Sequence, residues 1–189
     1  VHAAGYHEEQ TLENSFVLTD SVQRSVNGVS GVAAVTPRLE AFALASTGEK
    51  TRGCLVTGID PEGEDRVTHL RSKVVSGLFL QDSSSALLIA EGLSKRLQAD
   101  VGDTIVLLGQ GYYGTTAAGK YAVHGILRFG SPVLNDQLVF MPLSLAQHWL
   151  DAPDLATTLV ISPENPKNTE AVAARLRTAL SADFETLTW

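Results

Sequence analysis

Two glycine-rich patterns are the first candidates for chemistry in this 189-residue chain. Residues 109–114 read GQGYYG and match the dinucleotide-binding pattern GxGxxG, which needs a helix directly after it to hold a pyrophosphate. Residues 114–120 read GTTAAGK and match the start of a phosphate-binding loop, which needs Ser or Thr next, whereas Tyr121 follows. Because strand-like residues follow both patterns, we interpret them as a glycine-rich loop between strands.

The patterns for nucleophilic and metal chemistry are incomplete as well. Ser30 lacks the last glycine of a GxSxG nucleophile elbow, because Val32 occupies that place. His7 lacks the second histidine of a metalloprotease helix. Two carboxylate pairs lie in expected loops, where solvated charge is the usual state: Glu8/Glu9 and Glu62/Glu64. We therefore predict no catalytic residue, no metal site and no cofactor.

The composition is that of a globular protein without a nucleic-acid partner. The chain is 44% hydrophobic and 19% charged, and its length allows one large domain or two small interlocked ones. Its net charge is −7, and its 14 Lys and Arg residues form no basic stripe of the kind that phosphate backbones require. Cys54 is the single cysteine, which excludes an internal disulfide and a cysteine-based zinc site.

The two ends of the sequence bear on its origin. The chain contains no run of 18 or more apolar residues, the length that spans a bilayer. It begins at Val1 without a methionine or a signal-peptide pattern, and it stops at Trp189 in a strand-like FETLTW. We expect it to be an extramembrane piece of a longer protein.

The elements that would position any site include a strand–helix–strand unit at residues 86–108. Residues 86–90 are an apolar run of strand length, residues 91–98 have helical spacing, and residues 104–108 are a β-branched, apolar strand. A helix of about two turns is unstable by itself in water, so it must pack on a sheet.

Periodicity and turn residues predict the remaining elements. Asn14 is expected to cap a helix that ends at Asn27, and Asp60–Asp65 is expected to form an acidic loop. The other expected helices cover residues 143–150 and 167–182. The other expected strands cover residues 1–6, 32–46, 51–59, 121–129, 137–141, 156–162 and 184–189.

This order of elements predicts an α+β fold with two subdomains. Residues 1–65 and 153–189 each combine strands with one helix, whereas residues 66–152 are rich in strands. We predict that residues 1–65 and 153–189 form one α/β subdomain, discontinuous in sequence, and that residues 66–152 form an inserted, mostly-β subdomain.

Segments of the chain resemble a known family in their order and spacing. They are VAAVTPRLEAFAL at 32–44, VTGIDPEGE at 56–64, the unit at 86–108 with its LxxxxGD turn, and the stretch from GKYAVHGILRFG to LAQHWL at 119–150. Together they resemble the periplasmic core domain of MacB-like, FtsX-related ABC transporter permeases, a family that includes LolC and LolE. The resemblance covers nearly the whole chain.

The resemblance implies a location and a mechanical role. It implies a non-catalytic periplasmic domain of a bacterial inner-membrane protein, with a porter-like α/β subdomain and an inserted Sabre-like subdomain. The implied partners are a cytoplasmic ATP-binding subunit reached through transmembrane helices, a second permease copy or paralogue, and a periplasmic partner or lipophilic cargo. Closure of the membrane helices would move the domain, so Val1 and Trp189 should emerge on one face, within roughly 20 Å.

The loop at residues 108–120 carries the contact candidates. In lipoprotein-releasing permeases a proline-containing hairpin at this place recruits a periplasmic carrier. Here the loop is short, glycine-rich and without proline, which argues against carrier recruitment by the same residues. Tyr112 and Tyr113 at its tip are candidate partner contacts, since tyrosine is enriched at interfaces; the alternative is a surface loop with two incidental aromatic residues.

Two other functional classes stay open from the sequence. A free-standing secreted binding module would need a secretion signal upstream and no membrane helices. An enzyme would need convergent polar groups in a deep pocket, which the sequence does not indicate.

Overall fold

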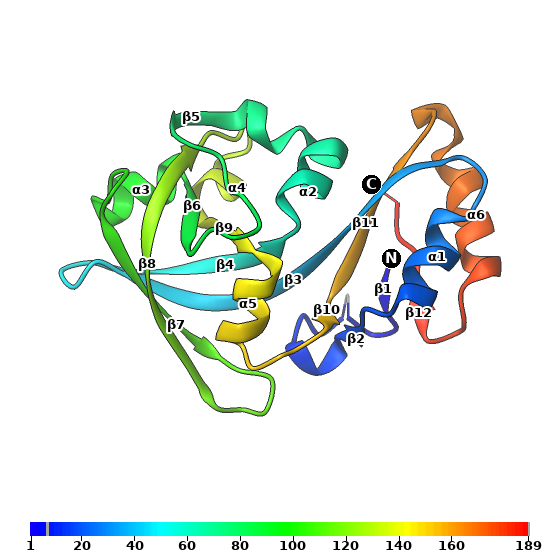
Figure 1. Ribbon diagram of the computed structural model, residues 1–189, viewed down its shortest axis with the longest axis horizontal. Helices are drawn as coiled ribbons and strands as arrows, with labels where there is room; N and C mark the ends of the chain where they lie inside the picture. The colour runs from blue at the N-terminus through cyan, green and yellow to red at the C-terminus, as the bar shows by residue number, and fades with distance from the viewer. Residues whose placement is uncertain (7, 189) are drawn as a thin grey trace.

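A computed structural model of the chain describes residues 1–6 and 8–188 and has an α+β fold, as predicted (Figure 1). The strands are β1 (His2–Ala3), β2 (Phe16–Val17), β3 (Val32–Ser46), β4 (Thr51–Ile59), β5 (Val74–Gly77), β6 (Ala86–Ala90), β7 (Thr104–Gln110), β8 (Thr116–Leu127), β9 (Leu138–Pro142), β10 (Leu155–Ala156), β11 (Thr158–Pro163) and β12 (Phe184–Glu185). The α-helices are α1 (Asp20–Asn27), α2 (Pro61–Thr68), α3 (Glu91–Leu97), α4 (Pro132–Gln137), α5 (Leu143–Trp149) and α6 (Thr169–Ala179). Short 3₁₀ helices cover η1 (Leu12–Asn14), η2 (Leu70–Lys73) and η3 (Pro166–Asn168).

One part of the molecule is a closed β-barrel. Each strand pairs with the next in the order β3–β4–β9–β6–β8–β7, and β7 pairs back with β3. The pairs β4/β9 and β6/β8 are parallel, and the other pairs of the ring are antiparallel. Closure pairs both sides of every strand in the ring, so the barrel exposes no free edge of its own.

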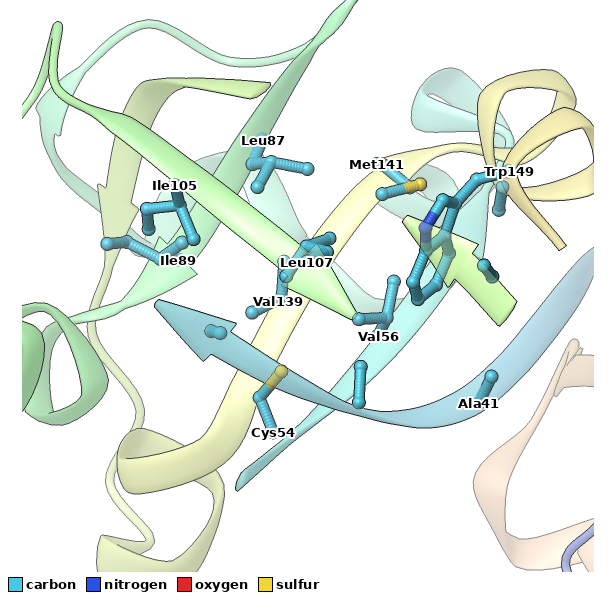
Figure 2. Close-up of a cluster of buried hydrophobic side chains, with 14 of the residues drawn as sticks. Ala41, Cys54, Val56, Leu87, Ile89, Ile105, Leu107, Val139, Met141 and Trp149 are labelled. Carbon is cyan, nitrogen blue, oxygen red and sulfur yellow. The ribbon is translucent and has the colours of Figure 1, made fainter. Parts of the chain in front are cut away.

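The barrel interior is a continuous apolar core. Figure 2 shows side chains from different strands meeting there, among them Ala41, Cys54, Val56, Leu87, Ile89, Ile105, Leu107, Val139 and Met141, together with Trp149 from α5. On β6, Leu87 and Ile89 lie in this core, whereas Leu88 lies in a second buried cluster together with Phe140. Because β6 is buried on both faces, its five residues are all apolar rather than alternating with polar ones.

The strand β3 continues from the barrel into a second layer. Its first part, Val32–Arg38, pairs with β11, and its last part, Arg38–Ser46, pairs with β4. Beyond β11 the sheet continues through β1 to β12, and α1 and α6 cover one face of it (Figure 1). The helices contribute Val26 and Leu176 to the cluster that seals this face.

The first and last strands of the described chain lie side by side. His2 on β1 is paired with Glu185 on β12, and β1 also pairs with β11. The first and last strands of the described chain therefore meet in one sheet. Trp189, on which the expected distance depends, lies outside the described residues.

The predicted division at residues 65 and 153 stays a prediction. Residues of β3 and β4, such as Ala43, Cys54 and Val56, share the barrel core with residues of β6 and β7. The α1 and α6 side chains pack in a separate cluster with β11. The buried side chains thus form an apolar core inside the barrel, the cluster that contains Leu88 and Phe140, and a third cluster under the two helices.

The predicted start of the first helix, at Asn14, is wrong. Asn14 ends the 3₁₀ helix η1, and its side-chain amide donates to the carbonyl oxygen of Glu9 at 2.8 Å. The helix α1 begins instead at Asp20, and Thr19 caps it by accepting a hydrogen bond from the Val22 amide at 3.2 Å. Asn and Thr both cap helices well, so residue type alone could not choose between them.

The acidic loop predicted at Asp60–Asp65 is also wrong, because this segment begins the helix α2. The side chain of Asp60 accepts a hydrogen bond from the Glu62 amide at 3.1 Å, and Pro61 occupies the first helical position. An N-cap Asp followed by Pro is a favourable helix start.

Smaller differences concern element ends. The strand β8 begins at Thr116 rather than Tyr121. The last α-helix is shorter than predicted at both ends, because its first turn is the 3₁₀ helix η3 and it stops at Ala179. The strand predicted at 156–162 is split into β10 and β11, which belong to different sheets. Among the described residues, no helix is long and apolar enough to cross a membrane.

An ion-pair network on α3 should make the stability depend on acid pH. Arg128 donates two hydrogen bonds to the Glu91 carboxylate, at 2.8 and 2.9 Å, and Lys95 lies 3.1 Å from it. The hydrogen bonds from Arg128, and then that from Lys95, lower the pKa of Glu91 from 4.5 to about 2. A carboxyl whose folded pKa is lowered stabilises the fold above its unfolded pKa, and this contribution is lost as the pH falls.

We predict that the free energy of unfolding falls less steeply in Glu91→Gln than in the wild type as the pH drops from about 4.5 to 2. Urea unfolding at pH values across this window, for the wild type and the variant, measures the difference in slope. The exposed turn residue Glu49 is the control, since Glu49→Gln should leave the slope unchanged. Equal slopes for wild type and Glu91→Gln would contradict the prediction.

Candidate functional site

The candidate site is the tip of the hairpin formed by β7 and β8, residues 111–115. The tip is closed by hydrogen bonds from the Gly111 amide to the Thr115 carbonyl at 2.8 Å and from the Gly114 amide to the Gly111 carbonyl at 2.9 Å. Gly114 has a φ of 74°, a conformation that glycine adopts without strain. The hairpin extends away from the barrel (Figure 1).

Both glycine motifs belong to this hairpin, as the interpretation of a loop between strands required. The strand β7 contains Gly109, and β8 starts at Thr116, where a nucleotide-binding motif would need a helix. Gly119 and Lys120 lie within β8. The expected loop at 108–120 is therefore shorter in the structure, because both strands extend into it.

The two candidate tyrosines have different environments at the tip. The Tyr112 amide donates to the Leu150 carbonyl at 2.8 Å, and the half-buried Tyr112 ring packs against the barrel core. Tyr113 is 72% exposed. The two rings are in edge-to-face contact with centroids 5.1 Å apart. Tyr112 is thus anchored to the fold, and its ring supports the ring of Tyr113, which faces solvent.

A groove of about 290 Å³ lies beside the tip. One wall is formed by residues 10–13 and the other by Gln110, Gly111 and Tyr112, with Phe42 between them. We call it the hairpin groove. Its walls come from the N-terminal segment, β3 and the hairpin, which are distant in sequence.

Apolar side chains continue from the groove along the outside of the barrel. Phe42 is 59% exposed, and Leu44 and Leu108 stand directly opposite each other on β3 and β7 with 49% and 42% exposure. The sequence prediction missed these residues. The signal was present in Ala41–Ala45, because a strand whose outward positions are also large and apolar, as here, indicates a contact surface.

The charge around the hairpin groove is acidic. Glu13 lines the groove, and Glu8 and Glu9 lie on the same N-terminal segment. Asp151 and Asp154 follow α5, directly after the Leu150 carbonyl that holds the hairpin tip. The sequence contains no Lys or Arg in residues 1–23 or 129–166. Association of this region with a basic partner surface is therefore favoured over association with an acidic one.

The structure does not assemble the other sequence candidates into a site. Ser30 precedes β3, and its carbonyl accepts a hydrogen bond from Arg175 at 2.8 Å. In residues 1–6 and 8–188, no group of three or more His, Cys, Asp or Glu side chains is placed to hold a metal ion. His7 lies outside the described residues. Cys54 is buried in the barrel, and burial raises the pKa of its thiol to about 12, so the reactive thiolate is disfavoured.

The carboxylate pair Glu62/Glu64 was expected to be solvated, and this is wrong for Glu64. Its side chain is fully buried and accepts hydrogen bonds from Arg38 at 2.6 and 3.0 Å and from the Thr68 hydroxyl at 2.9 Å. Burial by itself would lower the pKa of Arg38, but the hydrogen bonds and charge of Glu64 outweigh it and raise that pKa. The pair fixes α2 to β3 where β3 leaves the barrel.

The chain belongs to the family of MacB-like periplasmic core domains, and solved periplasmic and extracellular domains share its fold. The family model matches residues 4–179. The resemblance and the periplasmic location predicted from the sequence are thereby confirmed.

Individual relatives agree with this assignment. The lipoprotein-releasing system transmembrane protein LolE of Haemophilus influenzae is 26% identical over 142 residues, which are 71% of this chain and 34% of LolE. The extracellular domain of the ABC-type transporter YknZ from Gram-positive bacteria has a TM-score of 0.65 at 17% identity, covering 92% of this chain and 90% of that one. The periplasmic region of MacB from Actinobacillus actinomycetemcomitans has a TM-score of 0.62 at 14% identity, covering 94% and 80%. The chain spans about one third of the length of LolE.

Proposed function

We propose that this chain is a non-catalytic domain that transmits ATP-driven motion of permease membrane helices to a substrate or partner outside the cytoplasm. The observation that carries the proposal is the pairing of β1 with β12 in a member of this family. Because the first and last strands lie side by side in one sheet, the domain should move as a unit when the membrane helices attached to its two ends move. The proposed activity is export of the efflux or lipoprotein-release type.

The mechanical role needs a stiff domain, and several contacts support stiffness. The closed barrel has both edges of each strand paired, and β3 runs without interruption from the barrel into the sheet that carries the chain ends. The ion pair between the half-buried Arg38 and the fully buried Glu64 fixes α2 to this strand. Displacement at the β1–β12 end would therefore reach the hairpin tip with little internal deformation.

The proposed partners follow from the permease role. They are a cytoplasmic ATP-binding subunit, which acts through membrane helices, and a second permease copy or paralogue. A periplasmic partner or a lipophilic cargo would receive the motion. We propose that Tyr112 and Tyr113, at the hairpin tip, contact this partner, and the acidic groove beside them favours a basic partner surface.

The double variant Tyr112→Ala/Tyr113→Ala tests this contact. An aromatic residue central to an interface contributes about 2 kcal/mol or more, so we expect the affinity for the partner to fall roughly thirtyfold and export to fall with it. Export by the full-length permease with its ATP-binding subunit is the measurement, and the melting temperature of the domain reports folding.

Leu78→Ala provides the matched control, because Leu78 is 67% exposed and lies before β6, away from the hairpin. It should leave export unchanged. Normal export by the double tyrosine variant would exclude the hairpin tip as the contact.

A further inference from the structure

A pocket of about 200 Å³ lies between α6, β11 and the C-terminal residues 186–188. It is on the opposite part of the molecule from the hairpin groove, and the proposed partner contact makes no use of it. Its deep wall is aliphatic and is formed by Leu159 and Ile161 of β11 together with Val172 and Leu176 of α6. Among the described residues that line it, none has an ionisable side chain.

Residues 186–188 form the third wall of this pocket, beside β11 and α6, and hydrogen bonds hold both ends of this segment in place. Arg177 donates to the Thr186 carbonyl at 3.0 Å, and the Thr188 hydroxyl donates to the Glu170 carboxylate at 2.6 Å. These bonds keep residues 186–188 alongside α6 rather than collapsed onto β11. The pocket is therefore preformed, and ligand binding requires no free energy to open it.

The rim of the pocket can accept hydrogen bonds. The Thr188 hydroxyl donates to Glu170, and the Thr169 hydroxyl donates to the Pro166 carbonyl at 2.7 Å. The lone pairs of these two oxygens remain to accept a hydrogen bond. A molecule with an apolar body and one neutral hydroxyl donor fits an aliphatic interior with an accepting rim.

We propose that this pocket binds the end of one uncharged alkyl chain. A cavity of about 150 Å³ lined by aliphatic side chains takes up benzene, so about 200 Å³ holds a chain of roughly eight carbons. No lining side chain carries a charge, and burial lowers the pKa of the Val1 amine at the pocket to about 6, so above that pH a charged head group would find no opposite charge in the wall. This site does not depend on the permease role proposed above.

The test is a titration of the 189-residue chain with straight-chain 1-alkanols from butanol to decanol, followed by methyl NMR. The methyl signals of Leu159, Val172 and Leu176 should shift in a saturable way. Each added methylene should lower the Kd about fourfold until the pocket is full, near eight carbons, after which the gain should stop. At pH 8, where the Val1 amine is uncharged, octylammonium and octanoate should bind more weakly than octanol.

Two adjacent alanines of α6 provide the matched variants. Ala173 is 3% exposed and lines the pocket, whereas Ala174 is exposed on the outer side of the same helix. Ala173→Phe should fill the pocket and abolish octanol binding, and Ala174→Phe should leave binding unchanged. If Ala173→Phe does not fold, the smaller Ala173→Val should still weaken octanol binding by tenfold or more.

Each outcome decides the proposal. Saturable shifts confined to these methyl groups, with a chain-length optimum and loss in the Ala173 variants, support it. It is overturned if no methyl signal saturates, if Kd is independent of chain length, or if the Ala173 and Ala174 variants bind octanol equally well.

Discussion

Replacing Glu64 with alanine should lower the free energy of unfolding by about 3 kcal/mol, the low end of the cost of removing one partner of a buried ion pair, because the remaining Arg38 side chain is 22% exposed. The substitution leaves the Arg38 guanidinium without the carboxylate that accepts two of its hydrogen bonds. Glu40, 3.9 Å from Arg38, is too distant to replace those bonds. Urea unfolding of the purified domain measures the change.

Two further variants separate the buried charge from other effects. Glu62→Ala removes an exposed partner of Arg71 and should cost less than about 1 kcal/mol. The double variant Arg38→Met/Glu64→Leu removes both charges and should recover most of the stability that Glu64→Ala loses. If Glu64→Ala costs no more than Glu62→Ala, the Arg38–Glu64 pair does not secure α2 to β3.

Replacing Trp149 with alanine should cost about 3–5 kcal/mol, as expected for a large aromatic side chain in a core. Trp149 is 6% exposed and packs in the barrel cluster beside Met141 and Val56 (Figure 2). Its ring carbons lie 3.1 Å from the place that a Cβ on Gly109 would occupy, so the ring fills the space above β7. Its indole nitrogen has no hydrogen-bond partner among the described residues, so the loss comes from packing alone.

The same substitution should also loosen the hairpin. Trp149 precedes Leu150, whose carbonyl accepts the Tyr112 amide. We expect faster amide exchange at Tyr112 in Trp149→Ala than in the wild type. Val133→Ala, at a position that is 65% exposed, should change stability by less than about 0.5 kcal/mol and leave the exchange as it is. Equal stability of Trp149→Ala and Val133→Ala would show that Trp149 contributes nothing to the barrel core.

Strands buried on one or both faces could be predicted from the sequence, because their apolar pattern is local. The predicted strands at 32–46 and 51–59 coincide with β3 and β4, and the strand at 86–90 coincides with β6. Closure of the barrel could not be predicted. It depends on β7 pairing with β3, whose residues are more than 50 positions away, and no local pattern specifies that pairing.

The candidate site was partly predictable for a similar reason. Tyr112 and Tyr113 were recognisable as aromatic residues at a loop tip, and the structure places them there. The hairpin groove was not, because its walls come from the N-terminal segment, β3 and the hairpin. The burial of Glu64 was missed because α2 was interpreted as a loop, although Asp60 and Pro61 already formed a favourable helix start.

If this domain is a rigid body moved by membrane helices, as proposed, its motion relative to the membrane can be measured. The turn between β3 and β4 lies at the end of the barrel distant from α1 and α6 (Figure 1), and it contains the exposed residue Glu49. A dye can be attached at Glu49→Cys, because Cys54 is only 3% exposed and its raised pKa keeps the thiol unreactive. Other cysteines of the full-length permease would be replaced.

The measurement is energy transfer from this dye to acceptor-labelled lipid headgroups on the same side of a proteoliposome that contains the permease and its ATP-binding subunit. We predict that the transfer efficiency changes when ATP binds and returns after hydrolysis. A constant efficiency during sustained ATP hydrolysis would contradict the proposal that this domain transmits the motion.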